Sequence, residues 1–224
     1  MDSSVAELYV ILALNPEKGR ISISDIYFRY SLTGALIMEY LESGEIAIEN
    51  KRVVPSFIKN GETIHDLFAE RIMKSSKNKR LSFWISRLAN KSRIIFREII
   101  YSLEKERILR IEQKKFLNIF PYKRYWFTDN SVRIHLIELL RGILLYNRQP
   151  CKKDIMLLGL VEASNAYKLL SREKGESKLL HQKNTKLLKG DIISAEISQT
   201  IKEVQAAIVA SITAASIAAA GSSH

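Results

Sequence analysis

The sequence predicts a mainly α fold: a single globular, mostly helical domain over residues 1–224, with a protruding β-hairpin and a small second hairpin. The first indication is the scarcity of chain-breaking residues, because only 9 Gly and 4 Pro occur in 224 residues and few turns are available. The second is that apolar residues recur at helical spacing through most of the chain, whereas only two regions alternate as strands do. Hydrophobic residues make up 46% and charged residues 26%, which is typical of a folded soluble protein.

Stop and cap signals bound the helices that the apolar spacing predicts. Asn15-Pro16 ends the first helix, Ser24-Asp25 can cap the second, and Gly44 suits the left-handed residue after its last turn. Gly34-Ala35, inside the second helix, predicts that another element packs closely there, since a glycine in a helix otherwise costs about 1 kcal/mol. In chain order, the predicted helices cover residues 4–14, 24–43, 62–74, 81–90, 92–106, 130–146, 151–170 and 191–220.

The strand-like regions lie in the first and middle parts of the chain. EIAIEN, residues 45–50, alternates in polarity and turns at Asn50-Lys51 into 52–55, which predicts the small hairpin. The Lys-rich segment 171–190 is predicted to be a mobile surface loop with some helix. The strand-like pieces of the longer hairpin cover residues 108–113, 116–120 and 124–128.

Charge and cysteine usage limit the partners and the compartment. The 35 Lys and Arg exceed the 24 Asp and Glu, for a formal charge of +11, which favours anionic partners such as nucleic acid or an acidic bilayer. A soluble protein that is merely basic is an equally good interpretation. Cys151 is the only cysteine, so no intrachain disulfide forms and a cytoplasmic location is expected. The apolar run at 206–220 is predicted to be a buried terminal helix rather than a membrane span.

Motifs for catalysis, metal binding or a cofactor do not occur in the sequence. The chain lacks the Ser nucleophile elbow, the zinc-protease motif and both glycine-rich phosphate loops. The four histidines are far apart and have no metal-ligand spacing with Cys151. The sequence therefore predicts a non-enzymatic protein that needs no metal and no cofactor.

The segment from Asn90 to Trp126 carries the most distinctive charge. It holds ten basic residues against four acids, and Arg93 and Arg97 lie four apart on one flank of a predicted helix, where two guanidinium groups can grip a phosphate. A solvated helix flank explains the same pattern. Helix, basic helix and aromatic hairpin also resemble a winged-helix nucleic-acid binder, although the bulky aromatics and the shortage of exposed Asn or Gln argue against base reading.

A resemblance to the Golgi phosphoprotein 3 family extends over nearly the whole chain. The segments that carry it are YVILALNPEKGRIS, YSLTGALIMEYLESGEIAIENKRVV, KNGETIHDLFAERI, WISRL around Trp84, REIIYSLEKERILRIEQKKFLNIF, LLGLVEASNAYKLL and the Ile-rich final helix. The resemblance implies a helical fold with a protruding hairpin. It also implies a peripheral membrane adaptor that binds phosphatidylinositol 4-phosphate and the cytosolic tails of membrane proteins, beside a hairpin loop that enters the bilayer and contributes to oligomers.

Transferred residue by residue, the family's lipid pocket is only partly present in this sequence. The resemblance places the family's Trp at Ser24 and its nearby Arg at Thr33, so both side chains are replaced. It places the later basic pair at Arg93 and Phe96, with Arg97 as the adjacent substitute. An anionic headgroup is thus expected to meet a changed pocket.

The resemblance also places the apolar hairpin loop in the most aromatic part of the chain. Lys114 and Lys115 are expected to meet lipid phosphates, while nearby apolar side chains enter the interface. An alternative is that the hairpin buries its apolar face against another subunit and builds a homo-oligomeric scaffold. The apolar residues expected to contact the membrane or a second subunit are Phe116, Leu117, Ile119, Phe120 and Trp126.

Overall fold

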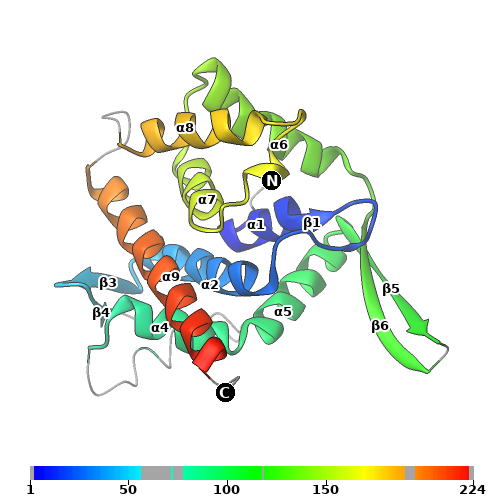
Figure 1. Ribbon diagram of the computed structural model, residues 1–224, viewed down its shortest axis with the longest axis horizontal. Coiled ribbons are helices and arrows are strands. Elements are labelled where there is room, and N and C mark those ends of the chain that lie inside the picture. The colour runs from blue at the N-terminus through cyan, green and yellow to red at the C-terminus, as the bar shows by residue number, and fades with distance from the viewer. Residues whose placement is uncertain (1–2, 57–71, 73–77, 118, 190–194, 222–224) are drawn as a thin grey trace.

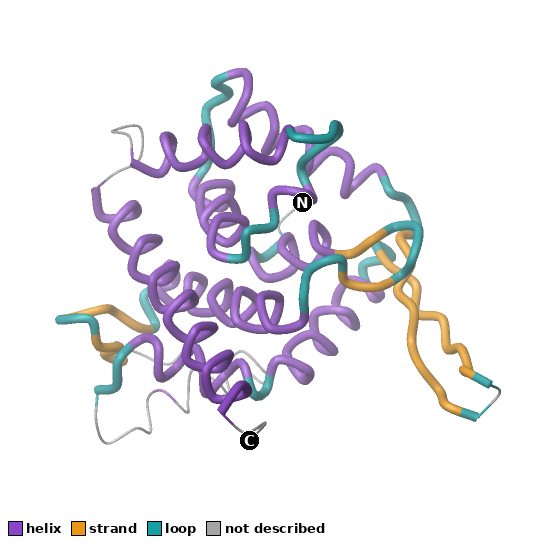
Figure 2. Tube along the Cα trace, in the orientation of Figure 1, coloured by secondary structure: helices purple, strands orange, loops and turns teal. Residues whose placement is uncertain are grey.

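A computed structural model describes residues 3–56, 72, 78–117, 119–189 and 195–221. Within these ranges the chain forms eight α-helices, one 3₁₀ helix and three two-stranded antiparallel sheets (Figures 1 and 2). The mainly α prediction with a protruding hairpin and a small second hairpin is confirmed. The elements follow one another in the order α1 (Val5–Ala13), β1 (Leu14–Asn15), β2 (Arg20–Ile21), α2 (Asp25–Ser43), β3 (Ile46–Glu49), β4 (Arg52–Pro55), α4 (Leu81–Ala89), α5 (Ser92–Lys105), β5 (Leu109–Phe116), β6 (Phe120–Phe127), α6 (Ser131–Tyr146), α7 (Lys152–Ala163), the 3₁₀ helix η1 (Tyr167–Leu169), α8 (Glu176–Lys189) and α9 (Ala195–Gly221).

Helix α2 is the centre of the fold. Every residue from Tyr30 to Met38 is buried, and the helix packs against α1, α4, α5, α7 and α9. It ends as the sequence predicted, because Gly44 takes the left-handed conformation at φ 78° that glycine adopts without steric strain. A central helix that is apolar on all sides needs partners on all sides, and the surrounding helices supply them.

Gly34 allows α9 to approach α2. A Cβ at Gly34 would lie 2.5 Å from Ile208 Cδ1, and Ile208 is fully buried on α9. The close packing predicted from Gly34-Ala35 is therefore confirmed, and the neighbour is the final helix.

We expect Gly34→Ala to lower the free energy of unfolding by about 1–2 kcal/mol, because overpacking against Ile208 outweighs the gain in helix propensity. Gly142→Ala is the matched control, since a Cβ there meets only Arg148 Cδ at 3.6 Å, and it should be neutral or stabilising by about 0.5–1 kcal/mol. Urea denaturation of both variants measures the difference. Equal effects of the two changes would contradict this account of the contact.

Several predicted boundaries are wrong for local reasons. The single helix predicted over 151–170 is interrupted after α7, where Asn165 has φ 49° and the Ala166 amide donates to the Val161 carbonyl, a helix-ending geometry. The two-residue strands β1 and β2 are too short to produce an alternating pattern. The helix predicted at 62–74 lies outside the described residues except for Ile72.

The Lys-rich segment 171–190 is mainly helical and not a loop. Helix α8 occupies Glu176–Lys189 and buries Leu180, Asn184 and Leu188 at intervals of four residues. Asn184 donates to the Leu158 carbonyl at 3.0 Å, so a polar residue holds one position of the buried stripe. The lysines cover the opposite, solvated side.

Helix α9 is buried over only part of its length. Ile201, Val204 and Ile208 pack in the core, whereas the most apolar window of 18 residues within Gln199–Ala220 has a mean hydropathy of 1.5, with 28% of it buried. By length and composition this segment can cross a membrane. The expectation of a buried terminal helix thus holds only for the inward face up to Ile212, which is 7% exposed, and not for Val209 at 51% or Ile217 at 68%.

Candidate functional site

The β5–β6 hairpin, called the long hairpin below, projects from the helical body (Figure 1). Its strands pair continuously from Leu109↔Phe127 at the base to Phe116↔Phe120 at the end. The strand-like piece predicted at 108–113 therefore extends to Phe116, whereas the piece predicted at 116–120 is wrong as a separate strand, since it contains the turn. The turn includes Leu117, whose φ is 50°, and it lies where the resemblance placed the apolar loop.

The end of the long hairpin is apolar and exposed. Leu117 and Ile119 are each 71% exposed and Phe120 is 61% exposed; these three residues are called the tip. The side chain of Phe116, which was also predicted to belong here, lies outside what the structure describes. Lys115 pairs in register with Pro121, and Lys114 with Tyr122, so both predicted lysines lie just behind the tip.

One face of the stem carries alternating cations and aromatic rings. Lys114 Nζ lies 5.7 Å from the Trp126 ring centre, and the Arg124 guanidinium lies 5.0 Å from that of Tyr122, within the range of cation–π attraction. Glu112 joins this face by accepting a 2.6 Å hydrogen bond from Trp126 Nε1 and by pairing with Lys114 at 3.3 Å. The Trp126 hydrogen bond, followed by Lys114, lowers the pKa of the Glu112 carboxyl.

Trp126 was predicted with the membrane-contacting residues, but it lies at the other end of the hairpin. It pairs in register with Arg110, next to the base, and is only partly exposed. A Cβ at Gly19, in the β1–β2 turn, would come within 3.2 Å of Trp126 Cε2. Trp126 therefore belongs to the stem, where it packs against the helical body.

A chain of aromatic rings connects the base of the long hairpin to the core. Tyr125 on β6 meets Phe96 on α5 edge-to-face at 5.3 Å, and Phe96 meets Phe28 on α2 in the same way at 5.5 Å. Phe28 then stacks on the buried Tyr9 at 5.9 Å. Such pairs stabilise by about 0.5–1.5 kcal/mol each beyond their buried area. The stem is thus a continuation of the core.

The predicted arginine pair lies on the exposed flank of α5. Arg93 is exposed and makes no ion pair with a described residue, whereas Arg97 pairs with the adjacent Glu98 at 3.4 Å and keeps 56% of its side chain exposed. An exposed pair of this kind is weak, so both guanidinium groups remain accessible to an anion. No described contact joins Arg93 or Arg97 to Lys114 or Lys115.

Two other positions of the family pocket hold side chains that pack inside the fold. Thr33 is fully buried and its hydroxyl donates to the Arg29 carbonyl at 3.0 Å, and Phe96 belongs to the aromatic chain. Ser24 is exposed at the start of α2. Two of the four transferred positions therefore cannot reach a headgroup.

Sequence reasoning missed Arg29, which lies one helical turn before Thr33. Its guanidinium donates to the Ala89 carbonyl and to Ser92 Oγ at 3.1–3.3 Å, and so holds α2 against the start of α5. It also pairs with Asp25 at 3.5 Å. The spacing of four from Asp25 is a local signal for the ion pair, but Ala89 and Ser92 lie 60 and 63 residues later, and no local pattern indicates those contacts.

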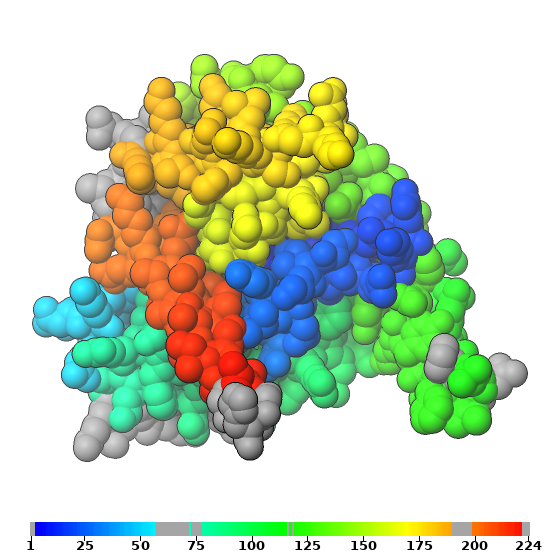
Figure 3. Space-filling view, viewed as in Figure 1, coloured from blue at the N-terminus to red at the C-terminus, as the bar shows by residue number. Residues whose placement is uncertain are grey.

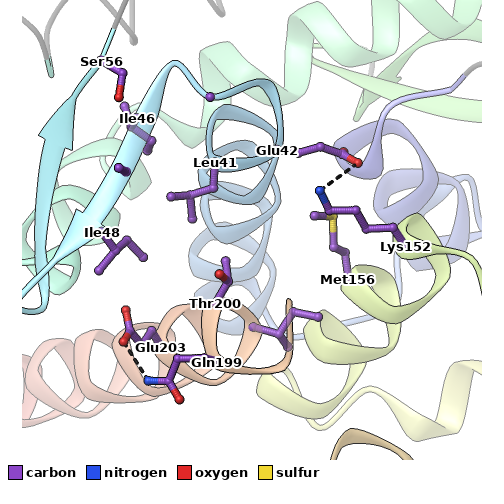
Figure 4. A pocket seen from close by; sticks show the side chains of 13 residues that line it. Leu41, Glu42, Ile46, Ile48, Ser56, Lys152, Met156, Gln199, Thr200 and Glu203 are labelled. Atoms are coloured by element: carbon purple, nitrogen blue, oxygen red, sulfur yellow. Dashed lines mark hydrogen bonds and ion pairs between the residues drawn. The ribbon is translucent and has the colours of Figure 1, made fainter. Parts of the chain in front are cut away.

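A separate cavity of 580 Å³ lies between the end of α2, β3, α7 and α9 (Figure 4). Its lining is mixed: Leu41, Ile46 and Met156 are apolar. The charged side chains are paired, since Glu42 pairs with Lys152 at 3.6 Å and Gln199 donates to Glu203 at 2.8 Å. No residue of the predicted site lines it. Within the part of the chain that the structure describes, no group of three His, Cys, Asp or Glu side chains could hold a metal ion.

The fold and this surface define a class of protein: a basic helical body that presents a cationic hairpin with an apolar tip. The chain belongs to the Golgi phosphoprotein 3 (GPP34) family, whose model matches residues 5–204. Membership suggests a Golgi-associated, lipid-binding adaptor role. No curated protein matches the chain significantly.

Proposed function

We propose that the protein is a non-enzymatic, peripheral membrane adaptor on the cytoplasmic side of the membrane, and that the long hairpin attaches it to anionic phospholipids. The observation that carries this proposal is the exposed apolar tip directly beyond Lys114 and Lys115. Apolar side chains partition into the bilayer interface, and lysines behind them face the phosphates. Cytosolic tails of membrane proteins are the partners we expect it to hold there.

The energetics favour weak and reversible attachment. The long hairpin carries five basic residues, Arg110, Lys114, Lys115, Lys123 and Arg124, against Glu112. A basic residue near an acidic surface contributes about 1 kcal/mol, and full burial of a tip side chain contributes about 1.5–3 kcal/mol. Only the tip and the nearest lysines reach the surface, so binding is sensitive to salt unless a homo-oligomer adds avidity.

The headgroup is recognised mainly by charge in this proposal. Arg93 and Arg97 remain available for a phosphate, but two of the transferred positions hold the buried Thr33 and the half-buried Phe96, which packs against Tyr125. We therefore expect phosphatidylinositol 4-phosphate to bind as one anionic lipid among others, with no large preference over phosphatidylserine at equal charge.

The tip also distinguishes this function from nucleic-acid binding. A wing that follows the phosphates of DNA carries polar and basic residues at its end, whereas Leu117, Ile119 and Phe120 are exposed and apolar here. Assembly through the tip, by contrast, uses the same apolar surface, so the test must separate it from lipid binding.

Vesicle flotation tests the proposal with the Leu117→Asp/Ile119→Asp double variant. Loss of about 2 kcal/mol of tip burial should reduce binding to phosphatidylserine-containing vesicles about 30-fold. Tyr146→Asp/Leu179→Asp is the control, because both residues are exposed apolar side chains, at 78% and 45%, on other elements, and it should bind like the wild type. Wild-type binding by the tip variant would overturn the proposal, as would binding that ignores the acidic lipid. If the tip variant differs from the wild type in mass by light scattering but floats equally well, the tip contacts a second copy of the chain and not the membrane.

A further inference from the structure

The last turns of α9 leave the core and expose apolar side chains. Ile201, Val204, Ile208 and Ile212 are at most 7% exposed and hold the helix in the core. Beyond Ile212 the helix continues with Ile217, which is 68% exposed, among exposed alanines. This end is a strongly apolar surface on a chain with a formal charge of +11.

The helix cannot cross a bilayer while the core is intact. Ile208 lies where a side chain at Gly34 would clash, and Ser211 Oγ donates to the Ser82 carbonyl at 3.2 Å, so α9 is held to α2 and α4. The turns beyond Ile212 extend about 13 Å at ~1.5 Å per residue, whereas a membrane-spanning helix must cover about 30 Å. These turns suit shallow insertion at an interface instead.

A basic groove lies beside this end of α9. The groove, of 620 Å³, lies between α4 with its preceding segment and α9, and is called the α4–α9 groove. No described carboxylate lines it, and its cations make no ion pair with a described residue. Glu203 lines the adjoining hollow, where it accepts a hydrogen bond from Gln199. The basic residues of the groove are Arg52, Lys79, Arg80 and Arg87.

An exposed aromatic ring lies among these cations. Phe83 is 41% exposed, with Lys79 Nζ 5.5 Å and the Arg87 guanidinium 6.0 Å from the ring centre. Ala210 and Ala214 of α9 line the other side. Cations that form no ion pair with a described residue, an aromatic ring and an adjacent apolar helix end are the combination that complements an anionic bilayer surface.

The end of α9 lies at the same edge of the molecule as the end of the long hairpin. In Figures 1 and 2 the end of α9 and the end of the long hairpin both reach the lower edge, while α8 lies along the upper part. Figure 3 shows α9 exposed along its course to that edge, beside the segment that contains α4. One flat surface can therefore meet both elements.

We propose that the α4–α9 groove and the exposed end of α9 form a second contact with the anionic bilayer. The groove holds lipid phosphates, and Ile217 enters the interface beside it. This inference rests on the proposed function of the long hairpin. Two separate contacts fix the orientation of the body on the membrane and add avidity.

Site-specific fluorescence separates the two contacts. In a Cys151→Ser background, Leu117→Cys, Ile217→Cys and Leu179→Cys each carry one environment-sensitive label; serine preserves the cap that Cys151 provides to α7. With phosphatidylserine-containing vesicles, the emission should shift to the blue at positions 117 and 217 and remain unchanged at position 179 on α8.

The possible outcomes separate failure of this inference from failure of the proposed function. A shift at 117 without one at 217 overturns the second contact alone, whereas no shift at either position overturns both. A shift at position 179 equal to that at 217 also overturns the second contact, since the membrane would then meet opposite faces of the body equally. A shift at 217 without vesicles, as the protein concentration rises, would assign this face to a second copy.

The groove has its own test. Arg80→Gln/Arg87→Gln should reduce binding to phosphatidylserine-containing vesicles about five- to tenfold. Lys178→Gln/Lys186→Gln, which removes the same charge from exposed positions of α8, should reduce it less than twofold. Equal losses in the two pairs would overturn the groove as a site, because net charge alone would then explain both.

Discussion

Replacing Glu176 by Gln is expected to lower the free energy of unfolding by about 3–5 kcal/mol, the usual cost of leaving one partner of a buried ion pair alone. Arg141 grips Glu176 with two hydrogen bonds of 2.7 and 2.8 Å, and the two side chains are only 8% and 15% exposed. Arg141 also donates to the Leu170 carbonyl at 2.7 Å. The pair therefore joins α6 to the start of α8.

This contribution should disappear in acid. The hydrogen bonds from Arg141, and then that from the Arg172 amide, lower the pKa of Glu176 from 4.5 to about 2. A carboxyl whose pKa is lower in the folded state contributes stability that is fully present above its unfolded value. The contribution is therefore complete above pH 4.5 and is lost as the pH falls toward 2.

Thermal unfolding between pH 7 and pH 2 measures both effects. The melting temperatures of the wild type and Glu176→Gln should differ most at neutral pH and converge in acid. Glu173→Gln is the control, since Glu173 is an exposed neighbour, and its effect should be small. Replacement of the whole pair, Arg141→Met with Glu176→Leu, should recover much of the loss. A constant difference at every pH would contradict the assigned role of the ion pair.

Replacing Phe96 by Ala is expected to have the next largest effect, about 2–4 kcal/mol of stability, since it is a half-buried aromatic ring with partners on both sides. Phe96 touches Phe28 on α2 and Tyr125 on β6. Its loss breaks the chain of rings in the middle. The stem of the long hairpin should then move independently of the core.

Amide hydrogen exchange measures this uncoupling. The Tyr125 amide donates to the Gly19 carbonyl at 3.0 Å. It should exchange faster in Phe96→Ala than in the wild type when the two proteins are compared at equal global stability. Tyr101→Ala is the control, because Tyr101 is 42% exposed, contacts Lys123 of the hairpin and makes no described ring contact with Phe96 or Tyr125. Unchanged exchange at Tyr125 would show that the register of β5 and β6 alone holds the stem.

The parts of the fold that follow from local chemistry were predictable from the sequence. Gly44 as the left-handed residue after α2 needs only the sterics of glycine. The close contact at Gly34 follows from the cost of glycine in a helix, although nothing local identifies Ile208 as the neighbour. The small hairpin at 45–55 follows from alternation and a turn.

The failures have a shared physical cause, which is that tertiary contacts decide them. The stripe on α8 is completed by Asn184, a polar residue buried because the Leu158 carbonyl accepts its hydrogen bond. The first strand of the long hairpin continues past residue 113 because Lys114 and Lys115 pair across the stem, which polarity alone does not indicate. Propensity cannot show contacts between distant residues.

The candidate site was predictable where it is exposed and not where it is packed. Leu117, Ile119 and Phe120 are apolar residues at a turn, and the structure leaves them exposed, while their contact with a membrane or a second subunit stays a prediction. Trp126 and Phe96 are also apolar, but the β1–β2 turn partly buries Trp126 and α2 partly buries Phe96. Whether an aromatic residue faces solvent or the core depends on elements far away in the sequence.

The long hairpin is continuous with the core. The membrane that we propose it binds therefore acts as a ligand of the folded state. Tyr125, Phe96, Phe28 and Tyr9 connect the stem to the most buried helices, so unfolding of the core also removes the support that orients the tip. A surface that binds only the folded chain must raise its midpoint of thermal unfolding. Acidic vesicles should thus increase the melting temperature with lipid concentration, and cutting the aromatic chain should weaken that linkage.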